Sequence, residues 1–288
     1  MKLLSVLGIC TVTSYRQLQC FVKELKLADI RIPVKNIENG KLLRSFFIII
    51  NFVLLIGMPY VIFMGSGDVL HSLSRIFLLF FDVMITLQFV LLVLELWARF
   101  SSVNACLQEV LSFPCSTTVG RAPPSRRLSL LQLQEAYVAL GRAADHLLAH
   151  FGVPVAVDIA KCVVGATSSS YDVSIELLQS NGKQGLVVPS VAVPEAWLAL
   201  HWLELLLMCL SCAAAENAAA ATGVILLRSS AVPRLRSADV DDFLRLTLHG
   251  PRLSFTAAGF VKIDRRLLVS VLTAIVTFLI IMGQLTFN

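Results

Sequence analysis

Ionisable side chains inside strongly apolar sequence are the residues of this chain best suited to chemistry. Asp82 interrupts the apolar run 76–97, and a carboxylate there is costly in lipid, so it must face other helices or water. Asp158 and Lys161 lie three residues apart in the run 146–167, a spacing that places both on one face of a helix. The sequence therefore predicts that these two side chains neutralise each other.

Two further pairs at helical spacing suggest acid–base or metal chemistry. His201 and Glu204 share one face of a predicted helix. An acid–base pair is conceivable there, and a hydrogen-bonded structural pair is favoured. His146 and His150 are four residues apart and share a face that suits a metal ion, but no third ligand follows at a telling position. We therefore expect no metal.

The seven cysteines form no short regular framework, and we infer no disulfide bonds from them. Cys209 and Cys212 form a C-x-x-C in a helical apolar run, where thiols packed against neighbouring helices are favoured over a redox or metal pair. The sequence contains no serine-hydrolase elbow, phosphate-binding loop or H-E-x-x-H motif. We expect neither enzymatic activity nor a cofactor.

The elements that must position these residues are transmembrane helices. Of the 288 residues 57% are hydrophobic and 15% charged, and the mean hydropathy is +0.79, outside the balance of a soluble domain. About 20 apolar residues suffice to cross a bilayer as a helix. Small residues at 211–223 permit close contact between helices. The sequence predicts an all-α, multi-pass helical bundle with five spans, at 46–64, 76–97, 146–167, 197–227 and 267–286.

The distribution of Lys and Arg predicts how the chain is oriented in the membrane. The segments 15–44, 99–145 and 228–266 hold seven, five and eight of these residues, whereas 65–75 and 168–195 hold one each. Basic residues are enriched on the cytoplasmic side. The long basic segments are therefore predicted inside and the carboxyl terminus outside, which explains the net charge of +5 without nucleic acid.

The segments outside the spans complete the predicted organisation. The short apolar stretch 1–14 is favoured as a remnant of an upstream span over a signal peptide. Residues 113–127 are rich in Pro, Ser and Arg and predict a mobile loop. The predicted parts are an N-terminal cytoplasmic segment 1–45, helices one to four over 46–227 with a cytoplasmic loop 99–145, a cytoplasmic segment 228–266, and a terminal helix 267–288.

Polar side chains recur at helical spacing in the last run. On a helix that advances about 100° per residue they fall within an arc of roughly 80°, which Ile281 shares as the single apolar residue. The amide of Gln284 is costly in hydrocarbon unless it meets a partner or water. The stripe therefore faces either other helices, which physics alone favours, or an aqueous path. Its members are Ser270, Thr273, Thr277, Gln284 and Asn288.

The carboxyl-terminal stretch FTAAGFVKIDRRLLVSVLTAIVTFLIIMGQLTFN resembles the end of an insect gustatory receptor. That family is marked by an Ala-Gly-Phe element, an aspartate a few residues on, and a closing motif of Thr-Tyr, five hydrophobic residues and Gln-Phe. Phe278 stands here for the tyrosine and Leu285 for the final phenylalanine, and both keep a large apolar side chain. The residues that match in order and spacing are Ala258, Gly259, Phe260, Asp264, Thr277 and Gln284.

The resemblance implies a seven-span receptor in which the five predicted spans are similar to the third through seventh of the family. The first two spans would then be missing, as in a partial gene model, a shortened isoform or a divergent member. The family has an inverted topology, and the orientation predicted from Lys and Arg agrees with it.

The resemblance also implies a ligand-gated, non-selective cation channel built from four like or related subunits. The last helix would line the pore, where four copies of Gln284 ring the axis on the same face as Thr277, and Ile281 or Ile280 one turn inward forms an apolar gate. The implied partners are cations, membrane lipid and a small-molecule tastant, either a sugar or a bitter compound. The implied location is the plasma membrane of sensory neurons, in the dendrite and also in the axon and cell body.

A ligand pocket is expected in the outer halves of the spans, where aromatic and polar side chains gather. An interfacial aromatic belt explains the same residues equally well. The candidates are Tyr60, Phe63, Arg75, Tyr171, Trp197 and His201.

Two other functions stay open. The chain could be a small multi-pass transporter or permease subunit, in which Asp82, Asp158, Lys161 and Glu204 form a buried relay for protons or ions. It could also be a non-functional truncated receptor.

Overall fold

A computed structural model describes residues 2–32, 45, 48–49, 69–112, 124–180, 188–231, 237–250 and 252–287. The first predicted span, 46–64, lies almost wholly outside the described residues, and so do the pocket candidates Tyr60 and Phe63.

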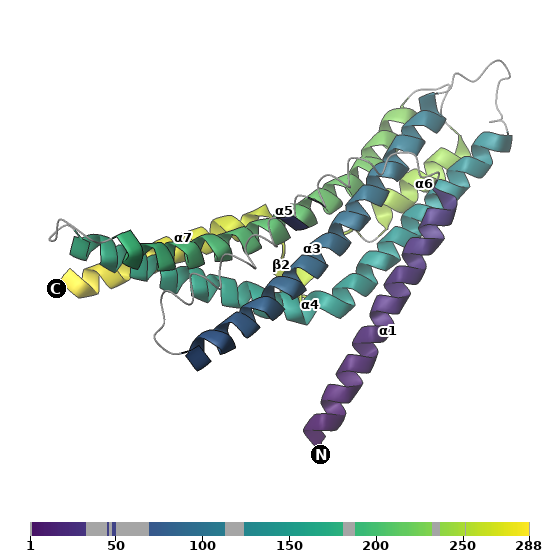
Figure 1. Cartoon of the computed structure of the whole chain (residues 1–288). Coiled ribbons are helices and arrows are strands. Elements are labelled where there is room, and N and C mark those ends of the chain that lie inside the picture. Colours follow the sequence, from purple (N-terminus) through teal and green to yellow (C-terminus); the bar gives the residue numbers. More distant parts are fainter. Residues whose placement is uncertain are drawn as a thin grey trace. The chain divides into compact units, whose positions relative to one another are not determined.

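The described chain is built from long α-helices, as the sequence predicts, and carries one short β-hairpin. Figure 1 shows these elements along the chain. In order they are α1 (Lys2–Arg31), α3 (Val69–Ser112), α4 (Pro124–Ser180), α5 (Val188–Ser230), α6 (Ala238–His249), β1 (Thr256–Ala257), β2 (Val261–Lys262) and α7 (Arg265–Phe287).

Four helices in the described part of the chain are long and apolar enough to cross a membrane. They overlap the second to fifth predicted spans. Three of the four stretches exceed 30 residues, so at about 1.5 Å per residue these helices are longer than a hydrocarbon core of about 30 Å. The stretches are Leu79–Ser112, Ser129–Glu176, Val193–Ser230 and Arg265–Gln284.

The helices also extend into residues that the sequence assigned to a loop. Residues 99–112 and 124–145 are helical, and α4 begins at Pro124, inside the predicted mobile loop. Proline is well suited to the first turn of a helix because its missing N–H has no partner there in any case. A search for long apolar runs missed these helical segments because they contain charged residues. Several of those residues form ion pairs with neighbouring helices.

The chain divides into two compact units, and α3, α4 and α5 contribute residues to both. Unit 1 comprises residues 1–42, 92–152 and 211–260. Unit 2 comprises residues 43–91, 153–210 and 261–288.

Unit 1 has an apolar core with a row of three aromatic rings. Tyr137 of α4 makes edge-to-face contacts with Phe100 of α3 and Phe243 of α6, at centroid distances of 5.6 and 5.8 Å. Phe100 and Phe243 are fully buried. Edge-to-face pairs of this kind contribute about 1 kcal/mol beyond the area that they bury. The row therefore joins α3, α4 and α6 within unit 1.

The small residues of α5 bring its backbone close to α3, as the sequence predicts. Asn104 donates its side-chain amide to the carbonyl oxygen of Ala218 at 2.8 Å. The hydroxyl of Thr222 donates to the amide oxygen of Asn104 at 2.6 Å. A side chain reaches the backbone of a neighbouring helix only where that helix carries small residues such as Ala218 and Ala219, both buried here.

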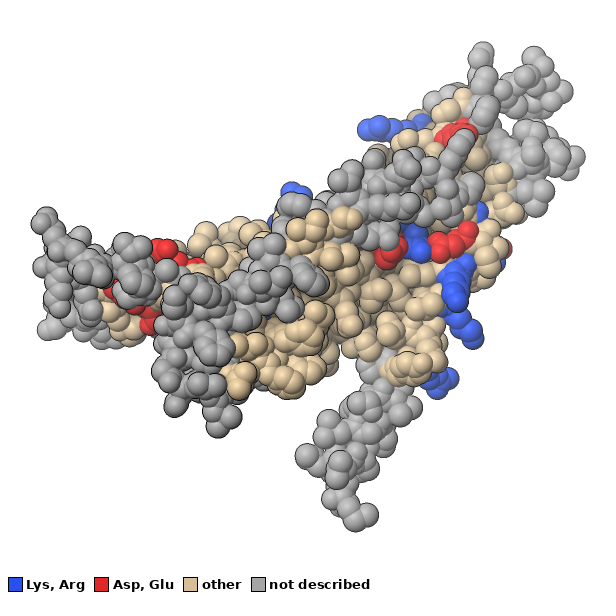
Figure 2. Space-filling model, in the orientation of Figure 1, with Lys and Arg blue, Asp and Glu red and all other residues tan. Residues whose placement is uncertain are grey.

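Ion pairs link α1 to α3 and α4 in unit 1. Arg99 binds the carboxylate of Asp29 through two nitrogens, at 2.8 and 2.9 Å, and also pairs with Glu95. Arg142 pairs with Glu24 at 3.0 Å. Figure 2 shows basic and acidic side chains next to one another over the part of the surface that contains α1. The bidentate pair of Arg99 fixes geometry as well as charge.

The Ala-Gly-Phe element forms the turn of the hairpin between β1 and β2. Ala258 and Gly259 both adopt positive φ angles, of 50° and 76°, and the N–H of Phe260 donates to the carbonyl of Ala257 at 3.0 Å. Positive φ costs little for glycine and about 1 kcal/mol for alanine. The N–H of Ala258 in turn donates to the carbonyl of Gly152 in α4, at 3.0 Å. The Ala-Gly-Phe element therefore forms the turn through its backbone and attaches it to α4.

Asp264 caps the amino terminus of α7. Its Oδ1 accepts hydrogen bonds from the backbone N–H groups of Arg266 and Leu267, at 2.9 and 3.2 Å. These donors have no partner inside the helix, so a side-chain oxygen at this position stabilises the first turn. The aspartate of the carboxyl-terminal motif thus determines where the last helix begins.

We expect Asp264→Ala to weaken the first turn of α7 by about 1 kcal/mol, whereas Asp264→Asn should keep most of the cap because its side-chain oxygen still accepts. Hydrogen exchange of the amides at 266–268 in purified protein measures this. The alanine variant should exchange about fivefold faster, as 1 kcal/mol implies. Equal protection in wild type and Asp264→Ala would rule out the cap.

Candidate functional site

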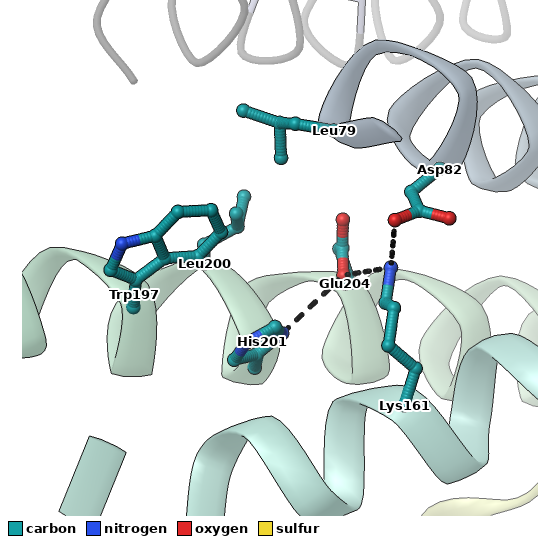
Figure 3. Close-up of a pocket in the computed structure, with 7 residues that line it drawn as sticks. All are labelled: Leu79, Asp82, Lys161, Trp197, Leu200, His201 and Glu204. Carbon is teal, nitrogen blue, oxygen red and sulfur yellow. Dashed lines mark ion pairs between the residues drawn. The ribbon is translucent and has the colours of Figure 1, made fainter. Parts of the chain in front are cut away.

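An ion cluster joins α3, α4 and α5 inside unit 2. Lys161 of α4 places its Nζ 2.8 Å from Oδ1 of Asp158 and 3.1 Å from Oδ2 of Asp82 on α3. The same nitrogen lies 3.7 Å from Oε2 of Glu204 on α5. The predicted pairing of Asp158 with Lys161 is confirmed. Figure 3 shows the ammonium group between Asp82 and Glu204. One cation therefore reaches carboxylates on three helices.

Two neutral donors also contact the buried carboxylates. The hydroxyl of Thr86 on α3 donates to Oδ2 of Asp158 at 2.6 Å, and the thiol of Cys162 donates to Oε2 of Glu204 at 3.1 Å. Asp158 is 6% exposed and Glu204 4% exposed. Buried carboxylates at this depth are tolerated only when such donors and a cation surround them.

The cluster nevertheless has more negative than positive charge. Asp82, Asp158 and Glu204 carry three formal negative charges against one positive charge on Lys161, so the formal sum is −2 when His201 is neutral. Two buried atoms, Oε1 of Glu204 and Nδ1 of His201, also have no hydrogen-bond partner among the described residues. The site can therefore accept a further cation or hydrogen-bond donor.

A cavity of about 260 Å³ opens beside this cluster. Its α5 wall consists of residues spaced three and four apart, which is one face of a helix, and its α3 wall consists of residues three apart. It combines an aromatic and aliphatic surface with several charged groups, the usual composition of a small-molecule site. The lining residues, shown in Figure 3, are Leu79, Asp82, Lys161, Trp197, Leu200, His201 and Glu204.

The imidazole of His201 is held between a tryptophan and a glycine. It stacks on Trp197, with the ring centroids 6.0 Å apart. A Cβ atom at Gly165 of α4 would collide with the imidazole, so the absence of a side chain there makes room for the ring. Nδ1 of His201 lies 3.9 Å from Oε2 of Glu204, too far for a hydrogen bond. The favoured hydrogen-bonded pair is therefore not formed, because packing fixes the ring out of reach.

The structure brings together only some of the predicted pocket residues. Trp197 and His201 line the cavity, whereas Tyr171 is half-buried in α4 and does not. Arg75 lies in α3, and its side chain is outside the described part. The four charged residues grouped under the transporter hypothesis do come together, and three of them line the cavity.

Sequence reasoning missed the aliphatic residues of the cavity. Leu79 precedes Asp82 by three positions, and Leu200 precedes Glu204 by four. Reading the helical faces that contain the buried charges would have found both, because residues three and four apart lie next to each other.

The histidine pair and the C-x-x-C have ordinary packing environments. His146 pairs with the amide oxygen of Gln17 at 2.7 Å, and His150 makes an edge-to-face contact with Phe151. Cys209 and Cys212 are both buried. In the described residues, the ligand-type side chains close enough to share a metal ion are instead Cys162, His201 and Glu204.

The polar stripe of α7 lies on an exposed face. The hydroxyls of Ser270, Thr273 and Thr277 each donate to the backbone carbonyl four residues earlier. Gln284 is exposed, and Ile281 is 50% exposed. Only 11% of the apolar stretch of α7 is buried inside the chain, against 61% for α5. α7 therefore packs against its own chain mainly through one apolar face, which contains the buried Val271 and Ile275.

We predict that Gly165→Ala destabilises unit 2 by about 1–3 kcal/mol, because the new methyl group displaces His201 from its packed position. Thermal unfolding of purified protein measures the effect. Gly141→Ala, also within α4 but with open space around it, is the matched control and should be neutral or stabilising, since alanine favours helix more than glycine does.

Removal of the imidazole in the double variant Gly165→Ala/His201→Ala should reduce the cost of the Gly165 substitution. If Gly165→Ala is as stable as Gly141→Ala, His201 is not wedged in place.

Comparison with known proteins identifies the family. The sequence model of the 7tm chemosensory receptors matches residues 3–287, so the match includes α1. Among characterised relatives, gustatory and pheromone receptor 32a of Drosophila melanogaster is 33% identical over 119 residues, which cover 41% of this chain and 25% of that receptor. Gustatory receptor for sugar taste 43a of the same species is 26% identical over 166 residues, covering 57% of this chain and 37% of that receptor.

The fold is also that of a solved insect receptor. The insect olfactory receptor OR5 from Machilis hrabei, solved in complex with eugenol, superposes with a TM-score of 0.64 over 96% of this chain and 82% of that receptor, at 10% identity. The matched part of this chain spans well under two thirds of either Drosophila receptor. Because the family model matches nearly the whole chain, and the helices and the carboxyl-terminal motif agree with it, this membrane protein belongs to the 7tm chemosensory receptors, the family of insect gustatory receptors.

Proposed function

We propose that this chain is a gustatory receptor that acts as a ligand-gated, non-selective cation channel. The observation that carries the proposal is the uncovered polar stripe of α7, with Thr277, Ile281 and Gln284 on one exposed face of a helix that is 11% buried over its apolar stretch. Polar side chains in a membrane need partners or water. Four copies of α7 around a shared axis supply both, because the stripe then lines an aqueous path and the neighbouring subunits cover the other faces.

The side chains of the stripe suit weak selection among cations. The amide of Gln284 can replace part of the hydration shell of an ion without strong preference. Ile281, or Ile280 beside it, supplies an apolar ring one turn inward of Gln284, which closes a pore by excluding water. The threonine hydroxyls already donate to their own helix, so their oxygen lone pairs remain available to cations.

The cavity between α3, α4 and α5 is the proposed ligand site. Trp197 offers an aromatic face, and Asp82, Lys161 and His201 offer hydrogen-bonding and charged groups. This combination suits a sugar, whose hydroxyls need donors and acceptors, and equally a bitter compound with a flat ring and a basic nitrogen. A ligand opens the channel only if it binds the open state better than the closed state. The proposed tastant must therefore contact helices that move relative to one another.

The proposed assembly is a tetramer of this chain or of this chain with related receptors, in the plasma membrane of sensory neurons. The dendrite is the proposed site of action, with the axon and cell body as further locations. The predicted orientation places the carboxyl terminus of α7 outside.

The transporter alternative draws on the same charged cluster, which the structure brings together at Lys161. Whole-cell current separates the two functions, since a channel passes ions down their gradient at rates that a transporter does not approach. A non-functional truncated receptor would show no current and no delivery to the cell surface.

We expect cysteine at position 284 or 281 to make the current sensitive to a water-soluble thiol reagent applied from outside, because these side chains face the proposed pore. Cysteine at 279 or 282 should have little effect, because those positions lie on other faces of α7. Currents are recorded from cells that express the chain alone or with a full-length family member, and the unsubstituted chain, with its own seven cysteines, is the control.

Conducting channels that stay insensitive at all four positions would mean that the ion path runs elsewhere. In that case the stripe of α7 is a packing surface, which was the alternative favoured by physics alone.

A further inference from the structure

We propose that Cys162, His201 and Glu204 bind a divalent transition-metal ion of the Zn²⁺ type. One ligand atom from each residue lies within 4.8 Å of the others. The ligands of a tetrahedral zinc ion, at bond lengths of about 2.0–2.3 Å, lie roughly 3.3–3.7 Å apart. The separations between the three ligand atoms therefore need to shrink by at most about 1.5 Å, which side-chain rotations can supply.

Unsatisfied polar atoms point to the same site. His201 is 8% exposed and Cys162 is fully buried. Nδ1 of His201 and Oε1 of Glu204 are buried without a hydrogen-bond partner among the described residues. In Figure 3 the oxygen of Glu204 that joins neither dashed line points away from both Lys161 and His201. Leaving such atoms unsatisfied costs about 1–3 kcal/mol each. The other oxygen of Glu204, Oε2, lies 3.9 Å from Nδ1 of His201 and 3.1 Å from Sγ of Cys162. A metal ion held by Oε2 therefore satisfies the imidazole nitrogen, and a rotation of the carboxylate brings Oε1 to the ion.

The charge of the surroundings also favours a cation. Lys161 lies 3.7 Å from Glu204 and opposes a metal ion, but its closer contacts are with Asp158 and Asp82, which offset it. The whole cluster sums formally to −2. Zn²⁺ replaces the thiol proton of Cys162, which leaves to solvent, and the sum becomes −1. The buried charge is therefore smaller with the ion than without it.

The ligand types select the metal. One thiolate, one imidazole and one carboxylate form a mixed set that suits Zn²⁺ and Co²⁺ and suits Mg²⁺ and Ca²⁺ poorly, because the latter prefer oxygen ligands alone. His201 and Glu204 come from one face of α5 and Cys162 comes from α4. The ion therefore links two helices at the edge of the cavity, and its fourth position is open to a water molecule or a ligand. This inference does not depend on the channel proposal.

The test uses the purified full chain in lipid nanodiscs with ZnCl₂ and CoCl₂ as probes. Elemental analysis after desalting should find one zinc ion per chain. Bound Co²⁺ should give tetrahedral visible bands and a near-ultraviolet thiolate-to-cobalt band. Cys162→Ser should abolish the thiolate band, and both Cys162→Ser and His201→Gln should lower the Co²⁺ affinity at least tenfold. Cys209→Ser, which removes a buried thiol outside the site, should change neither.

Three results would overturn the proposal: no stoichiometric zinc in the wild type, unchanged binding in Cys162→Ser, or loss of the thiolate band in Cys209→Ser. If a substituted chain aggregates, X-ray absorption at the zinc edge of the wild type decides. One sulfur with nitrogen and oxygen ligands supports the site. Two sulfur ligands, which a C-x-x-C would supply, would refute the site, and so would the absence of any sulfur ligand.

Discussion

The ammonium group of Lys161 is the single charge on which the arrangement of unit 2 depends. It lies within 4 Å of carboxylates from α3, α4 and α5, two of which are almost fully buried. Without it, three formal negative charges would share a small volume inside an apolar bundle, where repulsion is poorly screened. The three helices can pack together around these acids because the one flexible side chain of Lys161 reaches all three carboxylates.

The same interaction explains why a cavity is found at this place. Charged groups prevent the helices from closing into a continuous apolar core here, and the acids outnumber the cation. What remains is a cavity lined by charged groups together with Trp197 and Leu200. A bundle that must tolerate excess negative charge already has the chemistry of a binding site, for a tastant in the cavity or for a metal ion between α4 and α5. Both proposed binding sites therefore follow from one electrostatic imbalance, whereas the channel proposal rests on α7.

Apolar run length predicted the four long apolar helices of the described residues, because bilayer thickness sets the minimum length of such a run. Helical spacing likewise predicted the pair Asp158 and Lys161. The sequence could not show which helices become neighbours. Lys161 and Asp82 are 79 positions apart, and the sequence showed only that each is a charged side chain inside an apolar run. The charged helical segments 99–112 and 124–145 were missed because the ion pairs that stabilise them, such as Arg99 with Asp29, join different helices and cannot be read from local sequence.

The carboxyl-terminal motif shows a different limit. Its spacing indicated the family, yet the physical roles of its residues come from backbone geometry. Ala258 and Gly259 make a turn with positive φ, and Asp264 caps a helix. Neither role could be predicted from the spacing of hydrophobic residues. The motif is therefore a structural device that starts α7 at a fixed point, and Gln284 follows 20 residues later on the exposed stripe.

The most direct test of the central claim is a charge-compensation experiment on the cluster, measured as thermal stability of the purified protein. Lys161→Gln should destabilise the protein by about 3–5 kcal/mol, because it leaves buried carboxylates without their cation. Adding Asp158→Asn removes one of those charges while its oxygen can still accept from Thr86. The double variant should therefore recover at least half of the loss. A double variant no more stable than Lys161→Gln alone would contradict the claim that charge balance at Lys161 holds these helices together.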